Sequence, residues 1–307
     1  HMCKIAFLYP GQGAQQAGMG ADFYENGSLA KSFLDKAEGC LDFHLKEVCF
    51  RKDERLNKTE YTQPAMVSVC LAMTLELTAR GVKPDITAGL SLGEYAAVAA
   101  AGAFNSLDAV RLARKRGILM QNTVPEGEGG MCAILGMETE AAEKILREME
   151  GVSIANYNCP GQIVITGKKE SVKAAAERLK TAGAKRTVPL NVSGPFHSPL
   201  LVPAGEELKK EIEKISVHPL EVPYVANVTA EKVENADRIC GLLSRGVSSP
   251  VRWQQSMEYM IADGVDTFVE IGPGRTLTGF LKKINKEVSV YHISTWDDME
   301  NIGCRLC

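Results

Sequence analysis

The chain has 307 residues, of which 45% are hydrophobic and 24% are charged, and its formal net charge at pH 7 is −3. These values are typical of a globular protein with one large or two smaller domains, and they do not indicate a nucleic-acid partner. No apolar run approaches the length of a membrane span, and no signal peptide is recognisable, so we expect a cytoplasmic protein without a membrane partner. We also expect a monomer, although nothing in the sequence determines the oligomeric state.

Strands and helices alternate in the first part of the chain. Glycine at 81 and 102 and asparagine at 105 mark helix ends and a helix start. The elements expected here are a strand at 4–9, a loop at 10–13, a helix at 64–80, a strand at 85–90 and helices at 92–101 and 107–121.

A glycine-rich stretch at 126–130 interrupts this rhythm, and a shorter pattern follows. Strands are expected at 131–135, 152–157, 163–166 and 184–190, and helices at 139–149 and 171–181. This β-α-β-β-α-β order is that of a ferredoxin-like unit. We therefore predict a small ferredoxin-like domain over 126–193, inserted into a large domain formed by 1–125 and 194–307.

Alternation then resumes to the end of the chain. The elements expected are helices at 203–215, 253–262 and 276–284 and strands at 222–226, 267–271 and 288–293. Strands that alternate with helices predict a mainly parallel sheet with helices on both faces, so the fold class is α/β, with an α/β-hydrolase-like large domain. Ligands of such sheets bind at the carboxyl ends of the strands.

Ser91 lies between two glycines, in Gly-Leu-Ser-Leu-Gly, after a buried strand and before a helix of small side chains. Such a strand–turn–helix serine is typical of a nucleophile elbow, although a serine that merely caps the helix is an alternative. A serine nucleophile needs a base. Among five histidines, His1, His44, His218 and His292 are poorly placed, whereas His197 lies in a rigid turn where the two domains rejoin. The alternative for His197 is an exposed turn residue.

Arg116 shares one helical face with apolar neighbours: Ala109, Ala113 and Met120. A guanidinium on a buried stripe needs an anionic partner, which is either a structural carboxylate or a carboxylate of the substrate. The other basic residues of this helix are expected on a solvated face: Arg111, Arg114 and Lys115.

The loop after the first strand, Pro-Gly-Gln-Gly-Ala-Gln-Gln-Ala-Gly-Met-Gly, is not a phosphate loop, because Gln16 replaces the third glycine and no lysine follows Gly18. Its glycines instead allow the Gln12 N–H to point into a site, where it and the Leu92 N–H would form an oxyanion hole. Nine scattered cysteines predict reduced thiols, and the terminal Cys304 and Cys307 lack the second pair of a zinc site, so no metal is expected.

With these residues in place, the chain resembles the malonyl-CoA–acyl carrier protein transacylases of fatty-acid synthesis over nearly its whole length. The resemblance rests on motifs in a fixed order: 10–13 with Gln15, 62–65, 89–94, 116–121, 158–162, 194–197, 250–253 and 270–274. It departs at Leu90, where the family motif has histidine, and at Arg252, where an amide side chain is common. Since neither side chain is the base, we expect activity to survive.

The resemblance implies a role for each candidate residue. Ser91 would take malonyl from malonyl-CoA and pass it to the phosphopantetheine of acyl carrier protein, with His197 as base and then acid and a backbone carbonyl near Arg252 orienting it. Gln12 and Leu92 would hold the oxyanion. The substrate-binding residues would be Arg116 for the malonyl carboxylate, Met120 and Phe196 beside the α-carbon, and Gln63, Asn158 and Arg186 along the coenzyme A channel.

No cofactor is implied, since the coenzyme A thioester is itself the substrate. The alternatives are a serine thioesterase or esterase of the same fold, the acyltransferase domain of a polyketide-type synthase, and a docking module without activity. The apparent lack of an acid partner for His197 and the presence of Arg116 disfavour a plain hydrolase. The intact pair of Ser91 and His197 disfavours a docking module.

Overall fold

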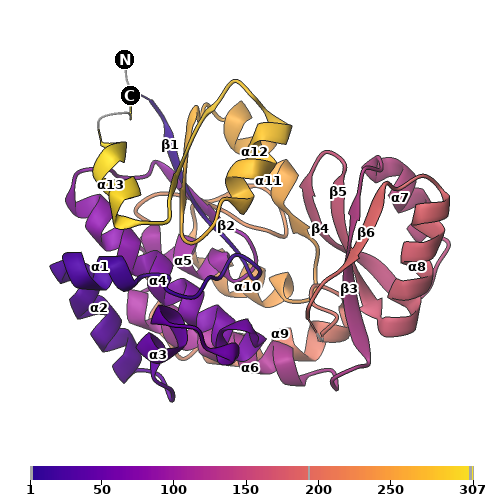
Figure 1. The fold of residues 1–307 in the computed structure, drawn as a ribbon, viewed down its shortest axis with the longest axis horizontal. Helices are drawn as coiled ribbons and strands as arrows, with labels where there is room; N and C mark the ends of the chain where they lie inside the picture. The colour runs from indigo at the N-terminus through magenta and orange to yellow at the C-terminus, as the bar shows by residue number, and fades with distance from the viewer. Residues whose placement is uncertain (1–2, 193, 304–305, 307) are drawn as a thin grey trace.

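The computed structural model of the chain describes residues 3–192, 194–303 and 306 (Figure 1). Figure 1 shows a larger body that contains both ends of the described chain and a smaller lobe formed by its middle part. Each part is built around its own sheet. The α/β class with a ferredoxin-like insertion, predicted from the alternation of elements, is confirmed.

The sheet of the larger body has six strands in the order β11-β10-β1-β2-β7-β8. The first five strands run parallel and β8 is antiparallel to β7, so the prediction of a mainly parallel sheet is confirmed. The strands are β1 (Ile5–Tyr9), β2 (Ile86–Gly89), β7 (Tyr224–Val225), β8 (Lys232–Val233), β10 (Thr267–Ile271) and β11 (Ser289–Ile293).

Helices cover both faces of this sheet. Because side chains alternate along a strand, Phe7 and Tyr9 of β1 join one core, whereas Ala6 and Leu8 join another on the opposite face. The second core is completed by α11 (Trp253–Ala262) and α12 (Thr276–Ile284). The remaining helices of the larger body are α1 (Ala21–Asn26), α2 (Ser28–Gly39), α3 (Leu45–Phe50), η1 (Glu54–Asn57), α4 (Thr59–Ala79), α5 (Gly93–Ala100), α6 (Ser106–Asn122), η2 (Pro199–Leu201), α9 (Val202–Ile212), η3 (Ala236–Arg238), α10 (Ile239–Gly246) and α13 (Trp296–Ile302).

The smaller lobe has the predicted β-α-β-β-α-β order. Its elements are β3 (Gly129–Leu135), α7 (Thr139–Leu146), β4 (Val152–Cys159), β5 (Gln162–Lys168), α8 (Lys169–Thr181) and β6 (Arg186–Pro189). Its sheet has the order β6-β3-β5-β4-β9, and the fifth strand, β9 (Val251–Arg252), pairs with β4 in parallel. The sheet therefore extends one strand beyond the predicted 126–193 segment.

Helix α4 begins at Thr59, five residues before the predicted start, and Pro64 lies inside it. A proline has no N–H to donate to the carbonyl four residues earlier, here that of Glu60. The Glu60 carbonyl accepts instead from Nη1 of Arg114, at 2.7 Å. The Arg114 side chain is only 12% exposed and pairs with Asp42, so its predicted place on a solvated face is wrong.

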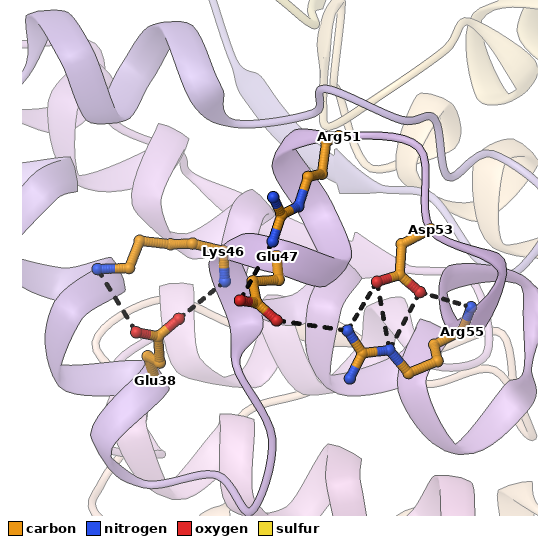
Figure 2. Close-up of polar contacts among 6 residues, drawn as sticks. All are labelled: Glu38, Lys46, Glu47, Arg51, Asp53 and Arg55. Carbon is orange, nitrogen blue, oxygen red and sulfur yellow. Dashed lines mark hydrogen bonds and ion pairs between the residues drawn. The ribbon is translucent and has the colours of Figure 1, made fainter.

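Ion pairs hold together much of the segment that contains α2, α3 and η1 (Figure 2). The pairs join Glu38 with Lys46, Glu47 with Arg51 and Arg55, and Asp53 with Arg55. Asp53 also caps η1, because its carboxylate accepts the Arg55 N–H at 2.9 Å, and the Arg55 guanidinium holds the pKa of Asp53 down at about 2. This segment leads into the start of α4, which contacts the loop that follows β1.

Most of the cysteines lie in the described part of the chain. Cys3 is disulfide-bonded, so the prediction of reduced thiols is wrong for it, and Cys304 and Cys307 lie outside the described residues. Free thiols are found at Cys40, Cys49, Cys70, Cys132, Cys159 and Cys240. Within the described ranges, no helix has the length and apolar character needed to cross a membrane, and no group of three or more metal-ligating side chains gathers.

Candidate active site

Ser91 stands on a sharp turn between β2 and α5. Its φ of 56° is in the left-handed region, which is uncommon for a residue other than glycine. The flanking glycines are required by close approach, since a Cβ on Gly89 would lie 1.9 Å from the Gly93 carbonyl oxygen and one on Gly93 would lie 2.4 Å from that of Tyr9. The turn therefore has the strand–turn–helix geometry that the sequence predicted.

His197 lies against Ser91. Its Nε2 is 2.8 Å from Ser91 Oγ, and its Nδ1 is 2.8 Å from the carbonyl oxygen of Gly246. Gly246 is the last residue of α10, where helix carbonyls lack partners within the helix. With Nδ1–H donating to this carbonyl, Nε2 is the unprotonated nitrogen that accepts from the Ser91 hydroxyl.

The expected orienting carbonyl near Arg252 is replaced chiefly by that of Gly246, while the Ser249 carbonyl, closer to Arg252 in the chain, also acts on His197. The Arg252 N–H donates to the Asn227 carbonyl at 2.9 Å, and its guanidinium lies over the ring of Tyr157, 5.4 Å from the centroid. No side-chain pattern marks Gly246, because it contributes only a backbone oxygen.

The surroundings of His197 keep its imidazole neutral. Burial and the nearby charge of Arg116 lower the pKa of His197 from its ordinary 6.5 to about 4, although hydrogen bonds to the carbonyls of Gly246 and Ser249 act in the opposite direction. The imidazole is therefore unprotonated near pH 7, as a base must be before it accepts a proton.

Arg116 lies beside the nucleophile on α6, with only 2% of its surface exposed. Its Nη2 donates to Ser91 Oγ at 3.2 Å and its Nη1 to Gln63 Oε1 at 2.9 Å, while its guanidinium lies over the ring of Tyr95. Its buried Nε has no hydrogen-bond partner within the described part of the chain, and no carboxylate there forms an ion pair with it. The nearby carboxyl of Glu94 is itself buried, which raises the pKa of Glu94 to about 8. The guanidinium of Arg116 therefore has an unused hydrogen-bond donor within the described part of the chain.

The two predicted oxyanion donors flank Ser91. The Gln12 side chain is turned aside, because its Nε2 donates to Thr59 Oγ1 at 2.9 Å on the first residue of α4. Both Gln12 and Leu92 line the same cavity as Ser91. Neither main-chain N–H donates to another group among residues 3–192, 194–303 and 306, so both remain available to an oxyanion.

A cavity of about 530 Å³ opens over Ser91 and is lined by loops and helices of the larger body and by strands of the smaller sheet. The predicted substrate-binding residues that line it are Gln63, Met120, Asn158 and Phe196. The structure does not bring Arg186 to this cavity, since its side chain is exposed at the start of β6. Of the predicted site residues, Arg186 alone lies apart from the rest in the structure described.

Two further amide side chains of the smaller lobe line the cavity, and the sequence reasoning missed them: Asn156 and Gln162. The signal that could have found Asn156 is its spacing from Asn158. These two buried asparagines, two residues apart in one strand, line the same cavity. A third missed residue, Asn227, bonds to the backbone of the elbow itself, where its Oδ1 accepts the Ser91 N–H at 2.8 Å.

Comparison with known proteins agrees with this geometry. Residues 6–298 match the acyl transferase domain family. The malonyl CoA-acyl carrier protein transacylase of Bacillus subtilis (strain 168) is 44% identical over 304 residues, covering 97% of this chain and 96% of the relative.

Solved structures give the same result. That of the malonyl CoA-acyl carrier protein transacylase from Clostridium perfringens has a TM-score of 0.95 and 43% identity, covering 99% of this chain and 97% of that one. A malonyl-transacylase solved in complex with a type II PKS acyl-carrier protein has a TM-score of 0.93 and 37% identity, covering 97% and 98% of the two chains.

Proposed function

This chain belongs to the acyl transferase family, among its malonyl CoA-acyl carrier protein transacylases, and from that premise we propose that it moves malonyl from malonyl-CoA to the phosphopantetheine thiol of acyl carrier protein. The transfer passes through a malonyl ester of Ser91, in the cytoplasm, and supplies fatty-acid elongation. The observation that carries the proposal is a guanidinium nitrogen of Arg116 placed 3.2 Å from the oxygen of a serine that is paired with a neutral histidine.

In the first half of the reaction, Ser91 Oγ attacks the thioester carbonyl carbon while His197 Nε2 takes the hydroxyl proton. The N–H groups of Gln12 and Leu92 hold the oxygen that becomes negative. As the tetrahedral intermediate collapses, the carbon–sulfur bond breaks and His197 returns the proton to the leaving sulfur of coenzyme A. The products are malonyl-Ser91 and free coenzyme A.

The second half reverses these steps with another thiol. The phosphopantetheine thiol of the carrier protein gives its proton to His197 and attacks the malonyl ester, and Ser91 Oγ leaves with that proton. Water in place of the thiol would hydrolyse the ester, so exclusion of water distinguishes a transferase from a hydrolase. The burial of His197, which is 4% exposed, supports the proposal on this point.

Arg116 is suited to malonyl because malonyl is short. Its carboxylate is separated from the thioester carbon by a single methylene, so a cation that binds the carboxylate must lie close to the nucleophile. Nη2 of Arg116 meets that condition. Acetyl lacks this charge, and a longer diacid would place its carboxylate farther from Ser91, so one guanidinium favours malonyl over both.

The cavity walls agree with the rest of the substrate. Met120 and Phe196 bound the cavity with apolar side chains, and we assign them to the space beside the malonyl α-carbon. The buried Oδ1 of Asn158 has no hydrogen-bond partner in the described part of the chain, and we assign it to an amide N–H of the pantetheine arm. Gln63 already positions Arg116. An exposed Arg186 would contact only a part of coenzyme A outside the cavity.

Intact-mass measurement tests the proposal. Brief exposure to malonyl-CoA should add one malonyl group to the chain, and Ser91→Ala should abolish the adduct. Added carrier protein should remove the adduct and itself gain malonyl. Release of free malonate at the same rate with and without carrier protein would instead identify a thioesterase, and an adduct that survives Ser91→Ala would contradict the assignment of the nucleophile.

A further inference from the structure

The side chain of Asn227 forms two hydrogen bonds to the backbone that leads into the nucleophile. Its Oδ1 accepts the N–H of Ser91 at 2.8 Å, and its Nδ2 donates to the carbonyl of Gly89 at 2.7 Å. Asn227 follows β7, which pairs in parallel with β2, so the carboxyl ends of the two strands lie side by side. The residue is 1% exposed, and water does not compete for these bonds.

The turn at Ser91 requires hydrogen bonds that hold its backbone in this conformation. A residue other than glycine in the left-handed region is strained, and the conformation persists only where the surroundings enforce it. The turn also takes the Ser91 N–H and the Gly89 carbonyl out of the strand ladder, and buried groups of this kind need partners. A primary amide supplies one acceptor and two donors on a single planar group, so Asn227 satisfies both.

The main chain of Asn227 is itself held on both sides. Its N–H donates to Glu94 Oε2 at 3.1 Å, and its carbonyl accepts the Arg252 N–H at 2.9 Å. Glu94 is in the first turn of α5, the helix that starts directly after the elbow. The buried Glu94 thus links Asn227 to the helix that follows Ser91.

We propose that Asn227 is a positioning residue that keeps Ser91 in its left-handed conformation, with Oγ within reach of His197. It acts through the backbone of the elbow, and its own side chain has both polar atoms engaged there. The assignment rests on the proposed function, because acylation of Ser91 is the step that it supports. Its effect should nevertheless extend to any reagent that acylates or phosphonylates this serine.

Three measurements on Asn227→Ala and Asn227→Asp test the proposal. The first is the single-turnover rate of malonyl-Ser91 formation, and the second is the rate of labelling by a small neutral fluorophosphonate. The third is the affinity for malonyl-CoA, measured in the Ser91→Ala background. Asn227→Ala should lower both rates by about 100-fold, the cost of a nucleophile displaced by roughly 1 Å, and leave the affinity unchanged. Asn227→Asp keeps the acceptor for the Ser91 N–H but loses the donor to Gly89, so it should lie between Asn227→Ala and the unmodified chain.

Thr87→Val is the matched control. Thr87 is equally buried in β2, and its Oγ1 donates to the Ala97 carbonyl at 2.8 Å within the same strand–helix unit. Its loss should lower the melting temperature while leaving both rates unchanged. A folded Asn227→Ala or Asn227→Asp chain with undiminished labelling, or one that loses only malonyl-CoA affinity, would overturn the proposal. If labelling falls in the variants but the unmodified chain forms no malonyl-serine, the positioning role stands and the proposed function fails.

Discussion

The role proposed for Arg116 makes substrate choice depend on a single buried charge. Arg116→Ala should lower kcat/KM for malonyl-CoA by about 10²–10³-fold, because the substrate carboxylate would lose its partner in a buried site. Acetyl-CoA has no carboxylate, so its kcat/KM should fall far less. Arg116→Lys should restore only part of the malonyl activity, since an ammonium does not reproduce the two-pronged contact. Steady-state kinetics with both thioesters measure these effects.

A Gln63 variant can be compared with the Arg116 variants in the same assay, because the Gln63 side chain accepts a hydrogen bond from Arg116 and does not contact Ser91. Gln63→Ala should give a smaller loss in the same direction, since the guanidinium would keep its charge and lose only one of its supports. Equal losses of malonyl and acetyl activity in a folded Arg116→Ala chain would mean that Arg116 serves the fold or the general chemistry, and would contradict the account of malonyl selection.

His197 should make the reaction unusually tolerant of acid. Its pKa is lowered to about 4, so the imidazole stays neutral and able to accept a proton as the pH falls from 7 towards 4. The acid limb of the kcat/KM profile should therefore lie well below 6.5, and His197→Ala should lower turnover by about 10²–10⁴-fold across the plateau.

The same profile tests the cause of the shift. Part of the lowering comes from the charge of Arg116, so in Arg116→Ala the pKa of His197 should rise and the acid limb should move to higher pH. Acetyl-CoA is the appropriate substrate for this comparison, because its binding does not use Arg116. An acid limb near 6.5 in the unmodified chain would show that His197 is solvated in solution.

At the scale of elements, α4 and α6 are joined where a proline interrupts the hydrogen bonds of a helix. The Glu60 carbonyl, left without an N–H by Pro64, accepts from Arg114. Arg114→Met should destabilise the fold by about 1–3 kcal/mol, chiefly through this part-buried carbonyl. The ion pair with Asp42 should contribute little, because the Asp42 side chain is 69% exposed.

A double-mutant cycle isolates this contribution. In a Pro64→Ala background, the N–H restored at position 64 can bond to the Glu60 carbonyl, so Arg114→Met should cost less there than in the unmodified chain. Urea unfolding of the four proteins gives the coupling free energy. Arg111→Met is the control, since Arg111 lies on the same helix but is exposed and pairs only with Asp108 and Cys40. An equal cost of Arg114→Met in both backgrounds would show that the Glu60 carbonyl does not depend on Arg114.

At the scale of the whole molecule, the proposed reaction site lies between the larger body and the smaller lobe. Ser91 and Asn227 follow strands β2 and β7 of the larger sheet, and Asn156, Asn158 and Gln162 of the cavity wall come from β4 and β5 of the smaller lobe. Strand β9 connects the two parts, since it pairs with β4 and continues directly into α11. The predicted domain boundaries at 126 and 193 remain a proposal. With these boundaries, β9 belongs to the larger domain by its place in the sequence but pairs with the sheet of the smaller domain.

We expect the chain to be a monomer. Among the described residues, the large hydrophobic side chains that are exposed are few: Leu29, Leu190, Leu200 and Val202. Stable homodimer interfaces usually bury a larger apolar area than such a set provides. Light scattering coupled to size-exclusion chromatography should give the mass of one chain at every concentration loaded, and a mass that doubles with concentration would contradict the expectation.

The sequence by itself determined the features that depend on neighbours along the chain. The apolar period separated strands from helices, and the turn residues marked most of their ends. The glycines around Ser91 identified the elbow, because only glycine allows the strand and helix to approach so closely. A charged residue on an apolar stripe identified Arg116. These signals suffice because each is local, with a steric or solvation requirement that few residue types meet.

Only the tertiary structure decided which distant groups meet. The carbonyl that orients His197 comes from Gly246, the side chain that holds the Ser91 backbone comes from Asn227, and the donor to the Glu60 carbonyl that Pro64 leaves without an N–H is Arg114. Every residue has a backbone carbonyl, so the sequence does not show which carbonyl orients a histidine. The sequence also does not show whether an asparagine in a turn faces water or lies buried against the turn that carries the nucleophile. Such contacts arise when parallel strands bring their carboxyl ends together, and the order of those strands is set by packing of the whole chain rather than by any segment of it.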